Sequence, residues 1–344
     1  IYSISQSFGF SFTQITSQVG LRREGTIAIP IELNNDDFTD LIIMMEDTSP
    51  LFYENLGNGD FREIALSSTG IENPMIANTA SVGDINNDGH DDLILISMEG
   101  DFSIYIGKGG ISFKDITEYS EIEINLANGN ADSQAKFVDL NNDGNLDLYL
   151  SFGNDNDLIF QNDGTGKFTN VYESSGINKV LNRRGFGVVF TDLNNDNLID
   201  LFMGYRFPLG ESFYDVYINK GNFKFDKLEI DHKLPEVKFP ISAVSIDYNN
   251  DGNNDIFVMT NTNLDFILEN DGRGNFKYLD KEIGFSQAVF HPEPVNGVVA
   301  ACDINNDGFT DLFLGSQLFI NNNGFFENIT PHIGLNFIGN PTFM

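Results

Sequence analysis

One loop pattern recurs six times along this chain of 344 residues. In its clearest form the loop is Asp-x-Asn-Asn-Asp-Gly-x-x-Asp-Leu, and each copy leads into an apolar segment. The copies begin at residues 32, 84, 139, 192, 247 and 303. This regular spacing indicates stacked or radially arranged units rather than a series of independent domains.

The loop carries oxygen-bearing side chains at positions 1, 3, 5 and 9 of every copy. These are early ligand positions of an EF-hand-type calcium loop, in which position 7 adds its backbone carbonyl and position 6 takes an unusual turn. Position 6 is glycine in four copies and Asp37 or Asn197 in the other two. Aspartate and asparagine are among the few other residues that tolerate positive φ, so the spacing predicts the same turn in all six loops.

The segments after each loop predict strands rather than the helix of an EF-hand. Position 12 is apolar in every copy, and short apolar runs without helical spacing, such as residues 93–96, suit buried strands. An Asn-x-Gly-x-Gly-x-Phe motif follows, as at residues 162–168, and marks a hairpin. In the second unit we therefore predict strands at 78–82, 93–96, 102–106 and 113–116. A four-stranded unit of about 50 residues is a β-propeller blade.

The repeat predicts one all-β domain over 1–344, a seven-bladed propeller supplied as a fragment. Six blades are complete, and the two ends of the chain are assigned to parts of a seventh. If those ends come from separate blades, the parent protein has eight. The predicted segments are 1–21 (the end of a blade), 22–70, 71–120, 121–177, 178–230, 231–285, 286–335 and 336–344 (the start of a further blade).

These loops and hairpins resemble the FG-GAP/VCBS repeat families, found in integrin α-chain propellers and in secreted proteins of the cartilage acidic protein and ASPIC/UnbV type. The resemblance rests on loops such as residues 139–148 and hairpins such as 162–168, and it covers nearly the whole chain. It implies calcium binding in each loop. The chain lacks a regular Phe-Gly and Gly-Ala-Pro pair in every unit, so integrin ligand recognition is not implied.

The calcium ligands that the resemblance implies occupy positions 1, 3, 5, 7 and 9 of the loops, about six sites in all. Position 1 of the first loop is a glutamate, whose longer side chain must fold back, so that site is expected to be weaker. The implied ligands are Glu32, Asn34, Asp36, Phe38, Asp40, Asp84, Asn86, Asp88, His90, Asp92, Asp139, Asn141, Asp143, Asn145, Asp147, Asp192, Asn194, Asp196, Leu198, Asp200, Asp247, Asn249, Asp251, Asn253, Asp255, Asp303, Asn305, Asp307, Phe309 and Asp311.

Charge supports a cation as the partner of these loops. The chain has 51 acidic and 19 basic residues, a formal net charge of -32, which argues against nucleic acids and anionic membranes. Three carboxylates in one loop repel one another unless a cation screens them. Ca²⁺ suits five protein oxygens better than Mg²⁺, and affinities of extracellular modules point to an extracellular, cell-surface or periplasmic location. The alternative is that these residues merely form Asn/Asp turns.

Two further features limit the functional classes. No apolar stretch approaches the roughly 20 residues of a membrane-spanning helix. The single cysteine, Cys302, excludes an intrachain disulfide and is predicted to be a buried thiol among small apolar residues.

The longer connections, which join the second strand of a blade to the third or one blade to the next, hold the candidates for a partner-binding face, predicted to lie opposite the calcium loops. One hypothesis is a binding or adhesion module whose basic rim meets an acidic glycan or protein patch. A second is a propeller enzyme of the polysaccharide lyase or dehydratase type, and a third is a scaffold domain of a larger surface protein. The alternative is that each basic residue only neutralises a nearby acidic one. No catalytic residue is assigned. The candidates are Arg22, Arg23, Arg183, Arg184, Arg206, His232, Lys238, His291 and Glu293.

Overall fold

The structure of the protein is a computed structural model that describes residues 18–21, 25, 27–72, 75–97, 99–124, 133–152, 157–177, 184–206, 212–229, 240–260, 265–285, 299–314 and 317–333. Over these residues the fold is all-β apart from four short helical segments, which are η1 (Leu66–Ser68), α1 (Tyr172–Ser175), η2 (Lys281–Ile283) and η3 (Thr330–His332). No helix in these ranges has the length and apolar character needed to cross a membrane.

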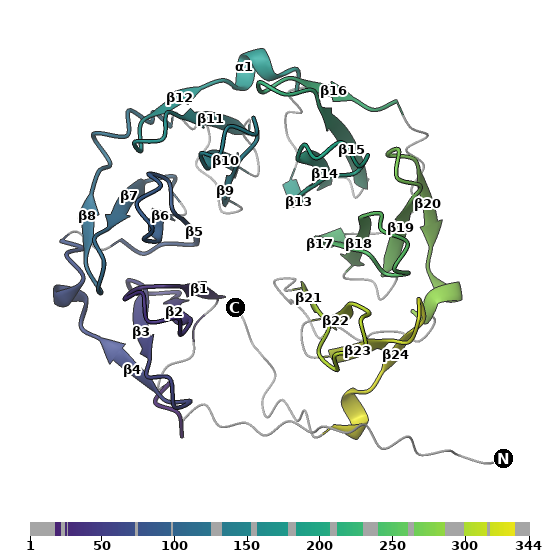
Figure 1. Cartoon of the computed structure of the whole chain (residues 1–344), viewed down its shortest axis with the longest axis horizontal. Coiled ribbons are helices and arrows are strands. Elements are labelled where there is room, and N and C mark those ends of the chain that lie inside the picture. The colour runs from purple at the N-terminus through teal and green to yellow at the C-terminus, as the bar shows by residue number, and fades with distance from the viewer. Residues whose placement is uncertain are drawn as a thin grey trace. The chain divides into compact units, whose positions relative to one another are not determined.

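The first three sheets each contain four strands that are neighbours both in sequence and in the sheet. The first consists of β1 (Ile27–Ile31), β2 (Asp40–Met44), β3 (Leu51–Asn55) and β4 (Phe61–Ile64) (Figure 1). The second consists of β5 (Thr79–Gly83), β6 (Asp92–Ile96), β7 (Phe102–Gly107) and β8 (Phe113–Asp115). The third consists of β9 (Ser133–Val138), β10 (Asp147–Phe152), β11 (Leu158–Asn162) and β12 (Phe168–Asn170).

The remaining three sheets repeat this order. The fourth consists of β13 (Arg184–Thr191), β14 (Asp200–Arg206), β15 (Ser212–Asn219) and β16 (Phe225–Lys227). The fifth consists of β17 (Pro240–Ile246), β18 (Asp255–Thr260), β19 (Phe266–Asn270) and β20 (Phe276–Leu279). The sixth consists of β21 (Val299–Cys302), β22 (Asp311–Leu314), β23 (Gln317–Asn321) and β24 (Phe326–Asn328).

The described strands belong to two compact units, one with β1 to β12 and β16, the other with β13 to β15 and β17 to β24. Within each unit, apolar side chains of successive sheets pack together. Ile42 and Phe52 of the first sheet share a cluster with Leu93 of the second, and Phe257 of the fifth sheet shares one with Leu312 of the sixth. The core therefore lies between neighbouring blades.

The second strand of a blade is the most buried element, because it is covered on both faces. Every described residue of β6, β10 and β18 is buried, which explains their continuous apolar sequences. The first strand is an edge strand and is far more open: β21 alternates between half-buried and exposed residues. Cys302 ends that strand and is exposed, so the prediction of a buried thiol is wrong.

The sequence-based strands agree closely with the structure. The four strands predicted for the second unit match β5 to β8 to within one residue at each end. The prediction of seven blades is corrected: the described residues form six four-stranded sheets, one for each acidic loop. The segments assigned to a seventh blade, 1–21 and 336–344, lie outside the described residues except for 18–21, of which 18–20 form a turn.

Candidate metal centres

The six acidic loops share one backbone conformation. Position 6 has positive φ in every copy, from 65° at Asn197 to 89° at Gly308, as the sequence predicts. Position 4 is also left-handed in every copy, with φ between 56° and 61° at its six asparagines, which sequence reasoning missed. Asparagine adopts this region more readily than most residues, so its recurrence at position 4 was the available signal.

Side chains at positions 1, 3 and 5 close the loop through bonds to its own backbone. In the second loop the two oxygens of Asp84 accept the N–H groups of Asp88 (3.1 Å) and Gly89 (2.8 Å). Asp88 in turn accepts the N–H of His90 at 3.1 Å. The loops that begin at Asp139 and Asp247 repeat these bonds. These residues therefore do form Asn/Asp turns, and the turns bring their side-chain oxygens together in one exposed loop.

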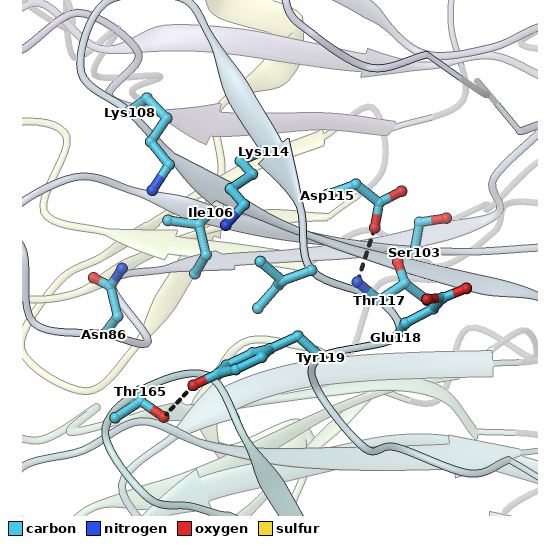
Figure 2. Close-up of a pocket in the computed structure, with 11 residues that line it drawn as sticks. Asn86, Ser103, Ile106, Lys108, Lys114, Asp115, Thr117, Glu118, Tyr119 and Thr165 are labelled. Carbon is cyan, nitrogen blue, oxygen red and sulfur yellow. Dashed lines mark hydrogen bonds between the residues drawn. The ribbon is translucent and has the colours of Figure 1, made fainter.

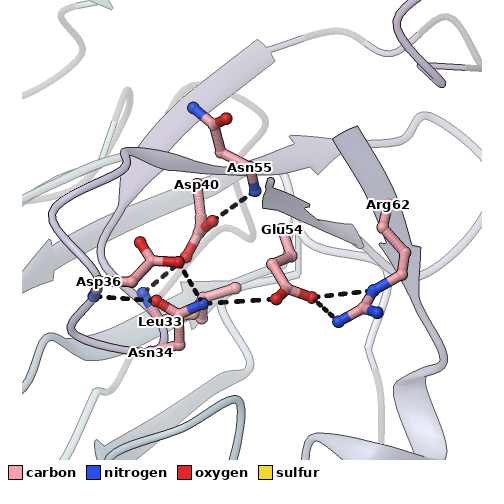
Figure 3. Close-up of polar contacts among 7 residues, drawn as sticks. All are labelled: Leu33, Asn34, Asp36, Asp40, Glu54, Asn55 and Arg62. Carbon is pink, nitrogen blue, oxygen red and sulfur yellow. Dashed lines mark hydrogen bonds and ion pairs between the residues drawn. The ribbon is translucent and has the colours of Figure 1, made fainter. Parts of the chain in front are cut away.

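The aspartate at position 9 has a role that sequence reasoning missed. Its side chain is at most 1% exposed in all six copies. In the first loop Asp40 accepts the backbone N–H of Leu33 at 3.0 Å and that of Asn55 at 2.7 Å (Figure 3). It thereby ties the loop between the first two strands of the blade to the third strand. Asp92, Asp147, Asp255 and Asp311 make the same pair of bonds, and Asp200 makes the first of them.

Burial and like charge act together on this aspartate. Burial raises the pKa of Asp92, Asp147 and Asp255 to about 7, and the carboxylates at positions 5 and 1 of the same loop add repulsion. The two backbone N–H donors oppose this increase only in part. Three carboxylates of one loop are therefore close enough to influence one another, and a cation among them would relieve both effects.

The donor atoms fit a hard cation. Each loop offers side-chain oxygens at positions 1, 3, 5 and 9 and a carbonyl at position 7, with no nitrogen or sulfur donor required. Each oxygen that accepts one N–H retains a second lone pair. Among the described residues, no three His, Cys, Asp or Glu side chains stand in a ready-made metal-binding group. The side chains at positions 1 and 5 would have to turn from backbone N–H groups toward an ion.

The first loop departs from the others at position 1. One oxygen of Glu32 accepts the N–H groups of Asn34 (3.2 Å), Asn35 (2.8 Å) and Asp36 (3.4 Å). In the second loop the aspartate at position 1 instead uses both oxygens, on positions 5 and 6. The longer side chain of Glu32 thus folds back onto the backbone of the loop and bonds to an earlier part of it.

In the third to sixth blades, the asparagine of the hairpin motif connects the blade to the preceding one. Asn270 is 1% exposed; its amide group donates to the carbonyls of Leu193 (2.8 Å) and Asn254 (3.0 Å). Its oxygen accepts the N–H groups of Gly272 (3.2 Å) and Gly274 (3.1 Å). Asn162, Asn219 and Asn321 likewise donate to position 2 of the preceding loop, at 2.7 to 2.8 Å. Sequence reasoning assigned this asparagine only to the hairpin.

The predicted partner-binding face lies almost wholly outside the described residues. Arg184 and Arg206 are ends of β13 and β14, and only their backbone is described. The other candidates lie outside the described ranges: Arg22, Arg23, Arg183, His232, Lys238, His291 and Glu293.

Six four-stranded blades with one recurring loop and one recurring inter-blade bond define a β-propeller protein. The model of the FG-GAP-like repeat matches residues 33–95, 84–150, 139–203 and 247–314, which is more than half of the chain. The chain belongs to the FG-GAP-like repeat family, and the resemblance noted in its sequence is confirmed.

Solved structures of low sequence identity share this fold. A lectin from Agrocybe aegerita, described as recognising non-reducing terminal N-acetylglucosamine, aligns with a TM-score of 0.64 and 17% identity over 94% of this chain and 84% of the lectin. YCF48 bound to a D1 peptide aligns with a TM-score of 0.50 and 9% identity, over 88% of this chain and 81% of that one. No curated protein sequence matches this chain.

Proposed function

We propose that this protein is a calcium-stabilised propeller that acts as an extracellular or cell-surface binding module. The observation that carries the proposal is the aspartate at position 9, which is buried in all six loops. In the second, third and fifth loops its pKa reaches about 7, and two further carboxylates of the same loop repel it. A calcium ion in each loop would remove that repulsion while leaving the bonds between position 9 and the backbone in place. The ion would be held by positions 1, 3, 5 and 9 and by the carbonyl of position 7.

Calcium bound in this way stabilises the blade rather than taking part in chemistry. The loop joins the first two strands, and position 9 also holds the third strand through a backbone N–H. An ion that binds only the folded loop adds its binding free energy to that of folding. At a free concentration ten times Kd, each site would contribute about 1.4 kcal/mol.

Two arguments support a binding role outside the cell. Loops of extracellular modules bind calcium at roughly 10⁻⁴–10⁻³ M, a concentration that cytosol does not reach. The lectin with the same fold is described as recognising a terminal sugar, which favours a glycan as the ligand of this chain as well.

Thermal unfolding in EDTA, Ca²⁺ and Mg²⁺ tests the calcium part of this proposal. We expect millimolar Ca²⁺ to raise Tm by several degrees over EDTA, and Mg²⁺ to have a much smaller effect. Asp143→Asn removes one carboxylate from the third loop and should reduce the increase. Asp163→Asn is the matched control. Asp163 accepts the same kind of turn bond, from the N–H of Thr165 at 2.8 Å, but lies in a hairpin and not in an acidic loop. Equal Tm values in EDTA and Ca²⁺ would rule out calcium stabilisation.

A further inference from the structure

An open cavity of about 900 Å³ lies beside β7 and β8 and the hairpin that joins β11 to β12, within one compact unit (Figure 2). Lys108, Lys114, Tyr119 and Thr165 are among its lining residues. Cavities of a few hundred to about 1,000 Å³ are the usual size for small-molecule sites. The cavity opens next to the second acidic loop, because Asn86 of that loop also lines it.

Lys114 lacks the ion-pair partner that the residues at the same place in the first and fifth blades have. On the outermost strand of the first blade, Arg62 lies opposite Glu54 and forms an ion pair with it. On that of the fifth blade, Lys277 lies opposite Glu269 at 3.1 Å. Lys114 occupies the corresponding place in the second blade, but Ile106 lies opposite. Its ammonium group therefore faces the cavity over an apolar side chain, and it forms no ion pair with a described residue.

Lys108 places a second cation at the same end of the cavity. It lies in the turn between β7 and β8, is exposed, and forms no ion pair within the described part of the chain. The same turn position is aspartate in the third and fifth blades, at Asp163 and Asp271, as their backbone bonds show. In a protein with 51 acidic and 19 basic residues, two unpaired lysines in one cavity concentrate positive charge at one end of it, while Asp115 and Glu118 also line it. Figure 2 shows both lysines together, on the side away from Asp115 and Glu118.

Tyr119 adds an exposed aromatic ring to this cavity. Its side chain is 48% exposed, and its hydroxyl lies 3.3 Å from Oγ1 of Thr165. Lys167 holds the ring from outside the cavity: its Nζ lies 5.0 Å from the ring centroid and is paired with Glu121. The ring is therefore fixed in place by two contacts before any ligand arrives.

The corresponding position is serine in both neighbouring blades. Thr69, Ser120 and Ser175 each donate a hydroxyl to the carbonyl three residues earlier, which aligns the three segments. The residues just before them are Ser68, Tyr119 and Ser174. A large aromatic side chain at a solvent-exposed position where serine suffices for the fold points to contact with a ligand.

We propose that this cavity binds a sugar residue that carries a single acidic group, and this proposal rests on the proposed binding function. The acidic group would lie against Lys108 and Lys114, the ring of the sugar against Tyr119, and the hydroxyls against Thr165 and the carboxylates of Asp115 and Glu118. Lysine binds such groups as a point charge, and an aromatic face with a polar rim suits a sugar. The net charge of -32 repels polyanions, which favours one acidic group at the end of a chain.

A glycan array made of matched pairs tests this proposal. Each pair is identical except for the acidic group: glucuronyl against glucosyl, sialylated against unsialylated lactose, and sulfated against unsulfated galactose. The whole chain is used, in Ca²⁺, and hits are titrated by calorimetry. We expect at least one acidic member to bind tenfold or more tightly than its neutral partner, because a hydrogen bond to a charged group discriminates by about that factor.

The test variants use residues that other blades carry at the same positions, so that the fold is retained. Lys108→Asn takes the residue of Asn322 and Lys114→Thr that of Thr169. The double variant should lose tenfold or more in affinity for the acidic sugar and little for any neutral one. Tyr119→Ser should weaken both members of a pair. Lys220→Asn is the control, because Lys220 occupies the same turn position in the fourth blade and should leave binding unchanged.

The outcomes separate this proposal from the function on which it rests. If no acidic sugar binds better than its neutral partner, or if its binding survives the double variant, the cavity is not the site. Neutral glycan hits that survive both Tyr119→Ser and the double variant would also overturn it, while leaving the proposed binding function intact. A chain that binds no glycan at all and whose Tm does not respond to Ca²⁺ would overturn both.

Discussion

The hairpin asparagine bonds one blade to the preceding one, so its replacement by alanine should lower the free energy of unfolding substantially. Asn270→Ala removes four hydrogen bonds at 2.8 to 3.2 Å, two of which are to the carbonyls of the buried Leu193 and the half-buried Asn254. The side chain is 1% exposed, so water does not replace its amide group without rearrangement. With about 1 kcal/mol for each bond and some further cost for the unsatisfied carbonyls, we expect a loss of about 3–5 kcal/mol in the free energy of unfolding.

Denaturant unfolding at saturating Ca²⁺ measures this loss. The chain has no tryptophan, so tyrosine fluorescence and far-UV circular dichroism serve as the two probes. Asn58→Ala is the matched control, since Asn58 is exposed and makes only local bonds with Asp60, at 2.9 and 3.1 Å. We expect the control to cost less than about 1 kcal/mol.

The comparison between these two variants decides the matter. A similar and small loss for both, below about 1 kcal/mol, would refute the view that this asparagine stabilises the junction between blades. A large loss for Asn270→Ala alone, with an unchanged dependence on denaturant, would support it.

Three further substitutions isolate other features of the first two blades. Gly89→Ala should cost about 1–2 kcal/mol in thermal unfolding purely through its positive φ, because a Cβ there meets no atom within 4 Å. Glu32→Asp introduces the residue of the other five loops and should increase the rise in Tm caused by Ca²⁺; an unchanged response would contradict the view that Glu32 weakens the first site. Arg62→Ala breaks the ion pair with Glu54. The Arg62 side chain is 65% exposed, so the free energy of unfolding should change by no more than about 1 kcal/mol. A larger loss in urea unfolding would contradict that estimate.

Much of the fold follows from local sequence signals. The acidic loop sets the repeat, and the apolar runs after it give the strands of the second blade to within a residue. Position 6 needs positive φ, and glycine, aspartate and asparagine are chemically suited to it, so the turn could be predicted in all six loops.

The parts that could not be predicted depend on contacts between segments far apart in sequence. The sequence around position 9 looks the same whether its aspartate is a metal ligand or an acceptor for buried N–H groups. The second role becomes visible only in the fold, where Asp92 accepts the N–H of a residue 15 positions later. The isolation of Lys114 depends on the register of β7 and β8, which places Ile106 opposite. Cys302 is flanked by small apolar residues, yet it ends an edge strand and is exposed. The blade number was overestimated because segments without an acidic loop were counted as part of a blade.

The most direct test of calcium in these loops is its stoichiometry. The purified chain is stripped with EDTA, dialysed against excess Ca²⁺ in the presence of Mg²⁺, and analysed for bound metal by mass spectrometry. We expect about six Ca²⁺ for each chain, one for each acidic loop. A chain that retains no Ca²⁺ above the level of a buffer blank would contradict it, and the loops would then be turns held only by their own hydrogen bonds.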